Sequence, residues 1–273
     1  MGRRWLVYPY HLWMLLFTVI PLALILFYAF FDANTMQFTL KNVEQAAEPL
    51  YLGVLLHSVW LAVLATAFCL LLGYPVAMIL SGTSVKYRNM LVMLLVIPMW
   101  MSFLLRTYSW LTLLERKGLI NSLLAWFNLP AINILYTDYA VMLGMVYNFL
   151  PFMILPIYSV LMKMDKSLLE AAADLGAGKW TTFWRVIFPL SLPGVYSGIL
   201  MVFMPAVTTF VISRLLGGGQ YMLIGNVIEQ QFLAIGNWGF GSAVSVLMLM
   251  IILVSMAFLG KYGRHGSGGG MFI

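Results

Sequence analysis

Residues 170–180, EAAADLGAGKW, place three charged side chains in a chain of 273 residues that is 63% hydrophobic and only 9% charged. The segment contains a Gly-Lys pair, which could belong to a phosphate-binding loop. Such a loop needs a glycine five residues before the pair and a Ser or Thr directly after the lysine. Position 173 is Ala and position 180 is Trp. The spacing therefore argues against a P-loop, and the charges need another explanation.

Few other residues could carry chemistry. His11 and His57 have no neighbour at a metal-ligand spacing, so we expect them to be packing or interfacial residues. Cys69 is the single cysteine and is expected to be a small apolar packing residue. Arg106 stands inside an apolar run, where a charge is costly. Two interpretations of Arg106 stay open: a functional residue, or a side chain that extends toward the outer membrane surface.

The elements that position these residues are long apolar segments. The mean hydropathy is +0.95, and the chain holds 9 Trp, 14 Tyr and 18 Phe, which is typical of a protein dissolved in lipid. A helix needs about 20 mostly apolar residues to cross the hydrocarbon core. Continuous rather than alternating apolar runs indicate helices and not a barrel. The sequence predicts an all-α membrane protein with six spans, at about residues 6–31, 52–80, 90–114, 140–162, 194–213 and 242–260.

The lysines and arginines predict the orientation. If the N-terminus is cytoplasmic, ten of them lie in inner segments and four in outer loops, with Arg106 inside a span. The positive-inside rule then places both termini in the cytoplasm. The formal charge of +6 is thus a topology signal, and nothing else supports nucleic-acid binding. The inner set is Arg3, Arg4, Lys86, Arg88, Lys163, Lys166, Lys179, Arg185, Lys261 and Arg264, and the outer set is Lys41, Arg116, Lys117 and Arg214.

Two function classes are disfavoured by the residues inside the spans. A membrane-embedded enzyme needs a nucleophile with its base or a metal cluster, and the spans contain neither. A self-sufficient secondary carrier usually needs an ionisable relay at membrane depth, and the predicted spans hold no Asp or Glu. A transporter subunit fits better than either.

The opening segment lies in a predicted inner loop, residues 163–193, which we call the elbow. Asp165 or Ser167 can cap a first helix, and Ser167 with Glu170 has capping-box spacing. Gly176 stands where a helix commonly ends in a left-handed residue.

A second short helix is predicted over about 179–188, with Pro189 and Pro193 ending it before the next span. A plain solvated connector is the alternative interpretation of the elbow. However, about thirty residues with two helices and exposed Leu175, Trp180 and Phe183 indicate a docking surface for a partner.

The polar outer segment at 217–232 is expected to turn at Gly217–Gly219 and to form a short amphipathic helix at or in the outer surface. We expect a single membrane domain over residues 1–273. Residues 261–273, which include GSGGG at 266–270, are expected to be a flexible tail.

EAAADLGAGKWTTFWRVIFPLSLP closely resembles the EAA loop of permease subunits of ATP-binding-cassette importers. Glu170, Ala171, Ala172 and Gly176 match that motif. The departures are mild, because Val186 stands for the usual Ile, and Phe188 with Pro189 stands for Leu-Pro. The resemblance covers nearly the whole chain and extends to the permeases of spermidine and putrescine importers. It is carried by residues 49–58, 71–77, 150–159, 168–177 and 223–232, with Trp238 and 239–243.

The resemblance implies a MetI-like permease fold and a transport role without enzymatic activity. It implies four kinds of partner besides the lipid bilayer: a cytoplasmic ATPase dimer, a second permease subunit (PotC-type), an extracytoplasmic polyamine-binding protein and the transported polyamine. This chain would bind no cofactor or metal itself, since ATP and Mg would bind to the ATPase. An importer of a different small solute is the alternative, and a self-sufficient carrier fits less well.

The same resemblance assigns the coupling surface to the elbow, whose first helix would insert into a groove on the ATPase. Glu170 is either a helix cap or an electrostatic contact to an ATPase arginine, and both can hold. The coupling residues are expected to be Glu170, Ala171, Ala172, Leu175, Gly176 and Ala177.

Polar and aromatic residues in or beside the spans are candidates for lining the translocation path. Each also has a structural interpretation: hydrogen bonds between helices, or aromatic belts at the membrane interface. Glu229 is the only acidic residue after the elbow. The candidates are Arg106, Tyr108, Trp110, Tyr147, Asn148, Thr208, Thr209 and Glu229.

Overall fold

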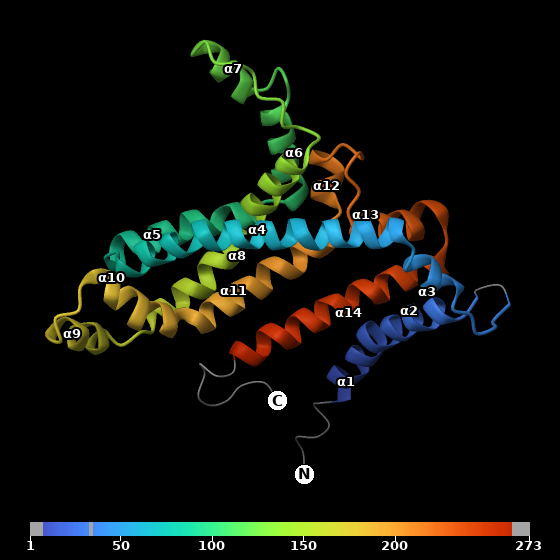
Figure 1. The fold of residues 1–273 in the computed structure, drawn as a ribbon, viewed down its shortest axis with the longest axis horizontal. Helices are drawn as coiled ribbons and strands as arrows, with labels where there is room; N and C mark the ends of the chain where they lie inside the picture. The colour runs from blue at the N-terminus through green and yellow to red at the C-terminus, as the bar shows by residue number, and fades with distance from the viewer. Residues whose placement is uncertain (1–7, 33–34, 264–273) are drawn as a thin grey trace. The chain divides into compact units, whose positions relative to one another are not determined.

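A computed structural model describes residues 8–32 and 35–263 (Figure 1). Every named element in these ranges is a helix, and the pairing of Phe31 with Phe38 is an isolated bridge. Five helices are long and apolar enough to cross a membrane, and a bent pair supplies a sixth candidate. This confirms the all-α prediction. The described chain divides into two compact units: residues up to His57 with Leu223–Leu253, and Ser58–Met222 with the residues from Val254.

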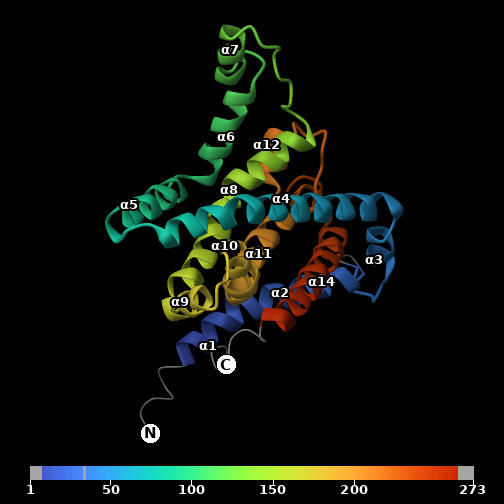
Figure 2. The same ribbon diagram turned by 60° about the vertical axis from the view of Figure 1, so that its left-hand side comes forward.

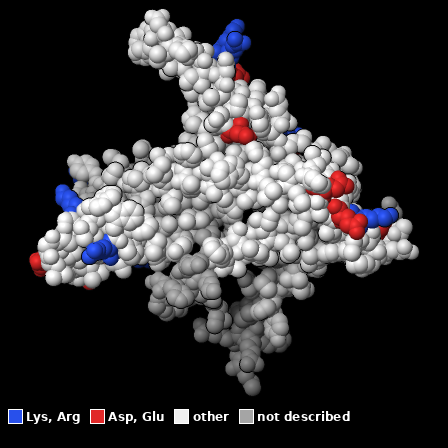
Figure 3. Space-filling model, in the orientation of Figure 1, with Lys and Arg blue, Asp and Glu red and all other residues white. Residues whose placement is uncertain are grey.

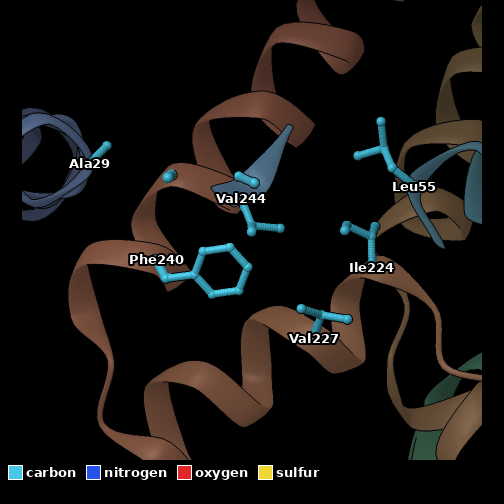
Figure 4. Close-up of a cluster of buried hydrophobic side chains, with 8 residues drawn as sticks. Ala29, Leu55, Ile224, Val227, Phe240 and Val244 are labelled. Carbon is cyan, nitrogen blue, oxygen red and sulfur yellow. The ribbon is translucent and has the colours of Figure 1, made fainter. Parts of the chain in front are cut away.

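The first unit is built around a small apolar core (Figure 4). Its elements are α1 (Tyr8–Met14), η2 (Leu15–Val19), α2 (Ile20–Phe30), α3 (Lys41–Ala46), the start of α4 (Pro49–Gly82), α13 (Ile224–Glu229), η5 (Gln230–Ile235) and the start of α14 (Trp238–Gly263). The core joins Ala29, Leu55, Phe240 and Val244 to α13. The Tyr51 ring lies edge-on to the Phe240 ring, with centroids 4.7 Å apart.

The short helix expected after Gly217–Gly219 is present as α13. Ile224 is 1% exposed and Val227 is also buried, so the apolar face of α13 fills the core of the first unit. The Asn226 carboxamide accepts a hydrogen bond from the Leu223 amide at 3.1 Å and closes the first turn. The helix therefore packs as part of the protein core.

The second unit holds the remaining elements. They are the rest of α4, α5 (Val85–Val96), η3 (Ile97–Trp100), α6 (Phe103–Leu114), α7 (Leu119–Trp126), α8 (Asp138–Met162), α9 (Lys166–Asp174), α10 (Lys179–Thr182), η4 (Phe183–Ile187), α11 (Phe188–Thr208), α12 (Val211–Leu216) and the end of α14. Helices α8 and α11 lie side by side in both ribbon views (Figures 1 and 2). The elbow is the connection between these two helices.

Two glycines bring α11 against α8. A Cβ atom at Gly194 would lie 2.9 Å from the Pro156 carbonyl oxygen and 3.0 Å from the Ile157 Cα. A Cβ at Gly198 would lie 3.2 Å from the Met153 carbonyl oxygen. The four-residue spacing is the small-xxx-small pattern that lets helix backbones approach closely in a membrane. The two backbones therefore approach closely at both glycines, although the Met153 sulfur would be the nearest atom to a Cβ at Gly198, at 2.7 Å.

The third predicted span, 90–114, is wrong as a single straight helix. Helix α5 ends at Val96, a short 3₁₀ turn carries Pro98, and Met101 and Ser102 are extended before α6 begins. Val85–Trp100 and Phe103–Trp126 meet at 93°. Because Pro98 lacks an amide hydrogen and restricts its predecessor, the apolar run is interrupted at this point.

The expected helix break at Pro189 and Pro193 is also wrong. The helix runs from Lys179 to Thr208 as one apolar segment. The Phe188 amide bonds to the Phe183 carbonyl, five residues back, in the π-helical turn directly before Pro189. A proline in an α-helix clashes with the carbonyl four residues earlier, and a wider turn relieves that crowding. The same arrangement recurs at η2, directly before Pro21.

The other spans agree with the sequence in place and differ at their ends. α4 extends over Pro49–Gly82 instead of 52–80. The fifth span ends at Thr208, and 211–216 form the separate helix α12. α14 continues through residue 263, so the first three residues of the expected tail are helical. Residues 264–273, with GSGGG, lie outside the described residues.

The close approach of α8 and α11 gives a testable expectation. Gly194→Ala should lower the thermal unfolding midpoint by several degrees, because overpacking against backbone atoms costs about 1–3 kcal/mol. Gly53→Ala in α4 is the matched control, since no atom lies within 4 Å of a Cβ there. It should be neutral or slightly stabilising, as replacing a helical glycine favours the helix by about 0.5–1 kcal/mol. Equal midpoints for the two variants would contradict this packing.

Candidate functional site

The first helix of the elbow, α9, is capped by Asp165. Its carboxylate accepts a hydrogen bond from the Ser167 amide at 3.0 Å. Asp165 and Ser167 are the two predicted caps, and the structure has Asp165 at the N-cap position. Hydrogen bonds from the Ser167 amide and hydroxyl lower the pKa of Asp165. The cap therefore stabilises the helix fully above the unfolded pKa of about 3.9, and the contribution is lost as the pH falls through the lower folded value.

Gly176 ends α9 as the sequence predicts. Its φ is +73°, in the left-handed region that favours glycine. The Ala177 amide bonds to the Ala172 carbonyl at 3.0 Å, and the Gly176 amide bonds to the Ala173 carbonyl at 2.9 Å. These two bonds form a Schellman motif, which satisfies carbonyls that a helix end would leave free. The turn toward α10 is thus fixed by hydrogen bonds.

Part of the surface of the elbow is apolar and exposed. Leu175 is 88% exposed and Trp180 is 74% exposed, as expected for a surface that a partner covers. Phe183 differs from the expectation, because it is half-buried with its ring edge-on to Tyr74 at 5.8 Å. Ala172 is the buried residue of α9.

Glu170 and Ala171 lie at the surface of α9. No capping bond is shown for the Glu170 side chain, and Asp165 occupies the cap position instead. The electrostatic contact to a partner therefore stays a prediction. Figure 3 shows charged side chains around α9 and α10, whereas α4 carries no Asp, Glu, Lys or Arg along its length.

A buried hydrogen bond ties the base of the elbow to α4. The Ser191 hydroxyl donates to the Phe188 carbonyl at 2.8 Å, so Tyr74 donates to Ser191 over its own 2.8 Å contact. The Tyr74 ring also packs against Phe183 and Phe188. Lys179–Thr208 is a continuous helix of 30 residues, about 45 Å long, so α10 of the elbow continues directly into α11.

Arg106 lies buried on α6, with 8% of its surface exposed. Its guanidinium carbon is 5.9 Å from the centre of the Phe103 ring, and its buried Nε has no hydrogen-bond partner in the described part of the chain. The Phe103 ring stacks on Phe149 of α8 at 6.4 Å. The side chain is therefore enclosed by protein, and the interpretation that it extends to the membrane surface is wrong.

Two neighbouring candidates on α8 have different environments. Asn148 is fully buried; its Nδ2 donates to the Gly144 carbonyl at 2.9 Å, and its Oδ1 has no partner among the described residues. Tyr147 is 39% exposed, and its ring lies edge-on to Trp110 of α6 at 5.3 Å. The structure thus brings Trp110 and Tyr147 into contact where α6 meets α8, and Arg106 reaches the same helix pair through Phe103, which stacks on Phe149.

The remaining path candidates have other environments. Tyr108 is 51% exposed on α6. The Thr208 hydroxyl donates to the Met204 carbonyl at 3.1 Å at the end of α11, and Thr209 is buried in the extended step before α12. Glu229 is half-buried on α13, in the first unit.

Some important residues were missed from the sequence. Gly194 and Gly198 were detectable by their four-residue spacing, whereas the pairing of Tyr74 with Ser191 spans 117 positions and has no local signal. Among the described residues no three His, Cys, Asp or Glu side chains are grouped as a metal would require.

Long apolar helices, an interfacial elbow and enclosed polar side chains define a polytopic membrane protein of the transport-permease class. The chain belongs to the family of binding-protein-dependent transport system inner membrane components, whose model matches residues 70–264. This family is one of multi-pass inner membrane permeases with a transport role.

Relatives and solved structures agree with this membership. The chain is 44% identical over 247 residues to the spermidine/putrescine transport system permease protein PotB of Escherichia coli (strain K12), covering 88% of this chain and 90% of that protein. It is 43% identical over 253 residues to PotB of Haemophilus influenzae, covering 89% and 88%. A chain of a bacterial alginate ABC transporter, in complex with a pentasaccharide-bound periplasmic protein, shares the fold with a TM-score of 0.82 at 18% identity, covering 98% and 97%.

The Schellman turn makes a local prediction that amide exchange can test. In Gly176→Val, the strained residue should open the turn at a cost of about 1–2 kcal/mol, so the amides of 176 and 177 should exchange about five- to thirtyfold faster. Gly178→Val is the matched control: Gly178 is extended, with φ −67°, and is equally uncrowded. Hydrogen–deuterium exchange that is unchanged in Gly176→Val, or equally accelerated in both variants, would show that the turn does not depend on Gly176.

Proposed function

We propose that this chain is a permease subunit of an ATP-binding-cassette importer and forms half of the translocation pathway for spermidine and putrescine. The observation that carries this proposal is 44% identity over nearly the full length to PotB proteins, whose names give those substrates. The elbow supports it, since a capped helix and a hydrogen-bonded turn present an exposed apolar face.

The coupling mechanism follows from the elbow's connections. A cytoplasmic ATPase dimer, which carries the ATP and Mg, contacts α9 and the exposed Leu175 and Trp180. Closure of that dimer displaces the elbow, and the continuous helix from Lys179 to Thr208 carries the displacement into the membrane. The permease itself binds no cofactor and hydrolyses nothing. Glu170, Ala171, Gly176 and Ala177 complete the coupling surface, and Ala172 supports it from the buried side of α9.

The complete importer contains two further proteins. A second permease subunit (PotC-type) supplies the other half of the path, and an extracytoplasmic binding protein delivers the polyamine. This arrangement places both termini and the elbow in the cytoplasm, in agreement with the distribution of Lys and Arg.

The spans guide the polyamine without binding it tightly. Asp138, the first residue of α8, is the only Asp or Glu within the five single-helix candidate spans of the described residues. A polyvalent cation that loses its water needs carboxylates for a tight site. Trp110 and Tyr147 offer aromatic faces for an ammonium group instead. Specificity then lies mainly with the binding protein, and Glu229 is the one acidic group beyond the elbow to attract the cation.

Reconstitution of all components tests both the architecture and the substrate. Glu170→Lys should lower uptake of labelled spermidine and putrescine by about tenfold or more, the equivalent of about 1.4 kcal/mol of docking free energy. Glu115→Lys, a reversal at an exposed glutamate outside the elbow, is the control and should leave uptake unchanged.

Glu229→Gln should reduce uptake of the polyamines without reducing basal ATP hydrolysis. Stimulation of ATP hydrolysis by an anion or a sugar but not by polyamines would overturn the substrate assignment and leave the importer architecture intact. Normal uptake in Glu170→Lys would overturn the coupling role of that residue.

A further inference from the structure

A cavity of about 630 Å³ lies behind the first helix of the elbow. The end of α4, the start of α5, the end of α8 and α9 enclose it, together with Ile187. All of these elements belong to the second unit. Both α4 and α8 are candidate membrane spans, so the cavity lies where two such spans end, which is where we expect lipid headgroups.

Arg88 gives the cavity its basic side. The Arg88 side chain is half-buried, and its Nη1 donates only to the Met162 sulfur at 3.3 Å. A thioether is a weak acceptor for a guanidinium that carries five N–H donors. The buried Nε has no partner among the described residues. A half-buried cation with unsatisfied donors at a cavity wall favours an anionic ligand that accepts several hydrogen bonds.

The other polar residues of the lining add one positive and one negative charge. Lys166 from α9 brings a second ammonium, and Glu170 contributes a carboxylate at the surface of the same helix. The formal charge of the lining is therefore +1. The hydroxyls of Ser81 and Thr83 are used as donors to the Met78 and Ile79 carbonyls.

The lining of the cavity also includes an apolar surface. It is formed by Met78, Val85, Leu161, Met162, Leu169 and Ile187. A free inorganic anion would leave this surface in contact with water, which is unfavourable. A ligand with a phosphate group and attached hydrocarbon chains would contact the basic residues with its phosphate and the apolar residues with its chains. Figure 3 shows separate basic and acidic side chains at the end of the molecule that carries α9 and α10, next to an uncharged surface.

We propose that this cavity binds the phosphate headgroup of an anionic phospholipid, with Arg88 and Lys166 on the phosphate and the acyl chains along the apolar side. The phosphate would join α5 to α9 and so fix the position of the elbow relative to the spans. The inference does not depend on the transported solute or on the identity of the ATPase.

The experiment uses the full-length protein, purified in detergent and titrated with phosphatidylglycerol or phosphatidylcholine, with bound lipid counted by native mass spectrometry. Phosphatidylglycerol should bind preferentially to the wild type. Arg88→Gln and Lys166→Gln should each weaken this binding by about fivefold, the effect of one basic side chain near an anionic lipid. Arg185→Gln is the matched control, because Arg185 is an exposed arginine of the elbow that does not line the cavity.

Three outcomes would overturn the proposal. Equal binding of the two lipids, or an equal loss in Arg185→Gln, would mean that the basic residues act only as a diffuse surface. Displacement of phosphatidylglycerol by glycerol phosphate at the same concentration would identify a soluble phosphate as the ligand. If Arg88→Gln does not fold, Lys166→Gln still tests the proposal, because Lys166 is exposed and this variant is expected to fold.

Discussion

The close contact between α8 and α11 is the constraint on which the rest of the second unit depends. The backbone of α11 touches that of α8 at Gly194 and Gly198, so the two helices have little freedom to slide past one another. The elbow connects the ends of these same two helices. Its position is therefore set by a packed helix pair, and its second helix joins α11 without an intervening linker.

The second helix of the elbow shows how a membrane helix accommodates prolines. Pro189 follows a π-helical turn, and the wider turn keeps the helix continuous from Lys179 to Thr208. This continuity matters for the proposed coupling, because a rigid-body displacement requires an unbroken helix between the elbow and the membrane. Pro98 lies instead in a short 3₁₀ turn, and the helices on its two sides meet at 93°. Proline thus occurs within a continuous helix in one span and at a bend in another.

Sequence patterns predicted the features that follow from local chemistry. Apolar runs located the spans, Asp165 was one of two proposed caps, and Gly176 was expected to be left-handed. The predictions that were wrong depend on contacts between residues that are distant in the sequence, or on backbone adjustments that no residue type signals. Phe183 was expected to be exposed because its contact with Tyr74 is not visible locally. The sequence around Arg106 allows two interpretations, because its burial next to Phe103 depends on how α6 meets α8.

The central claim is that the exposed face of the elbow docks on a cytoplasmic ATPase. The most direct measurement is photocrosslinking in cells from a benzophenone amino acid placed at position 175, where the native Leu175 is 88% exposed. A second probe at position 126, where Trp126 of α7 is 77% exposed in a predicted outer segment, serves as the reference. The account predicts an adduct between this chain and an ATPase from position 175 and none from position 126. Absence of that adduct at 175, or an ATPase adduct of equal yield at 126, would contradict it.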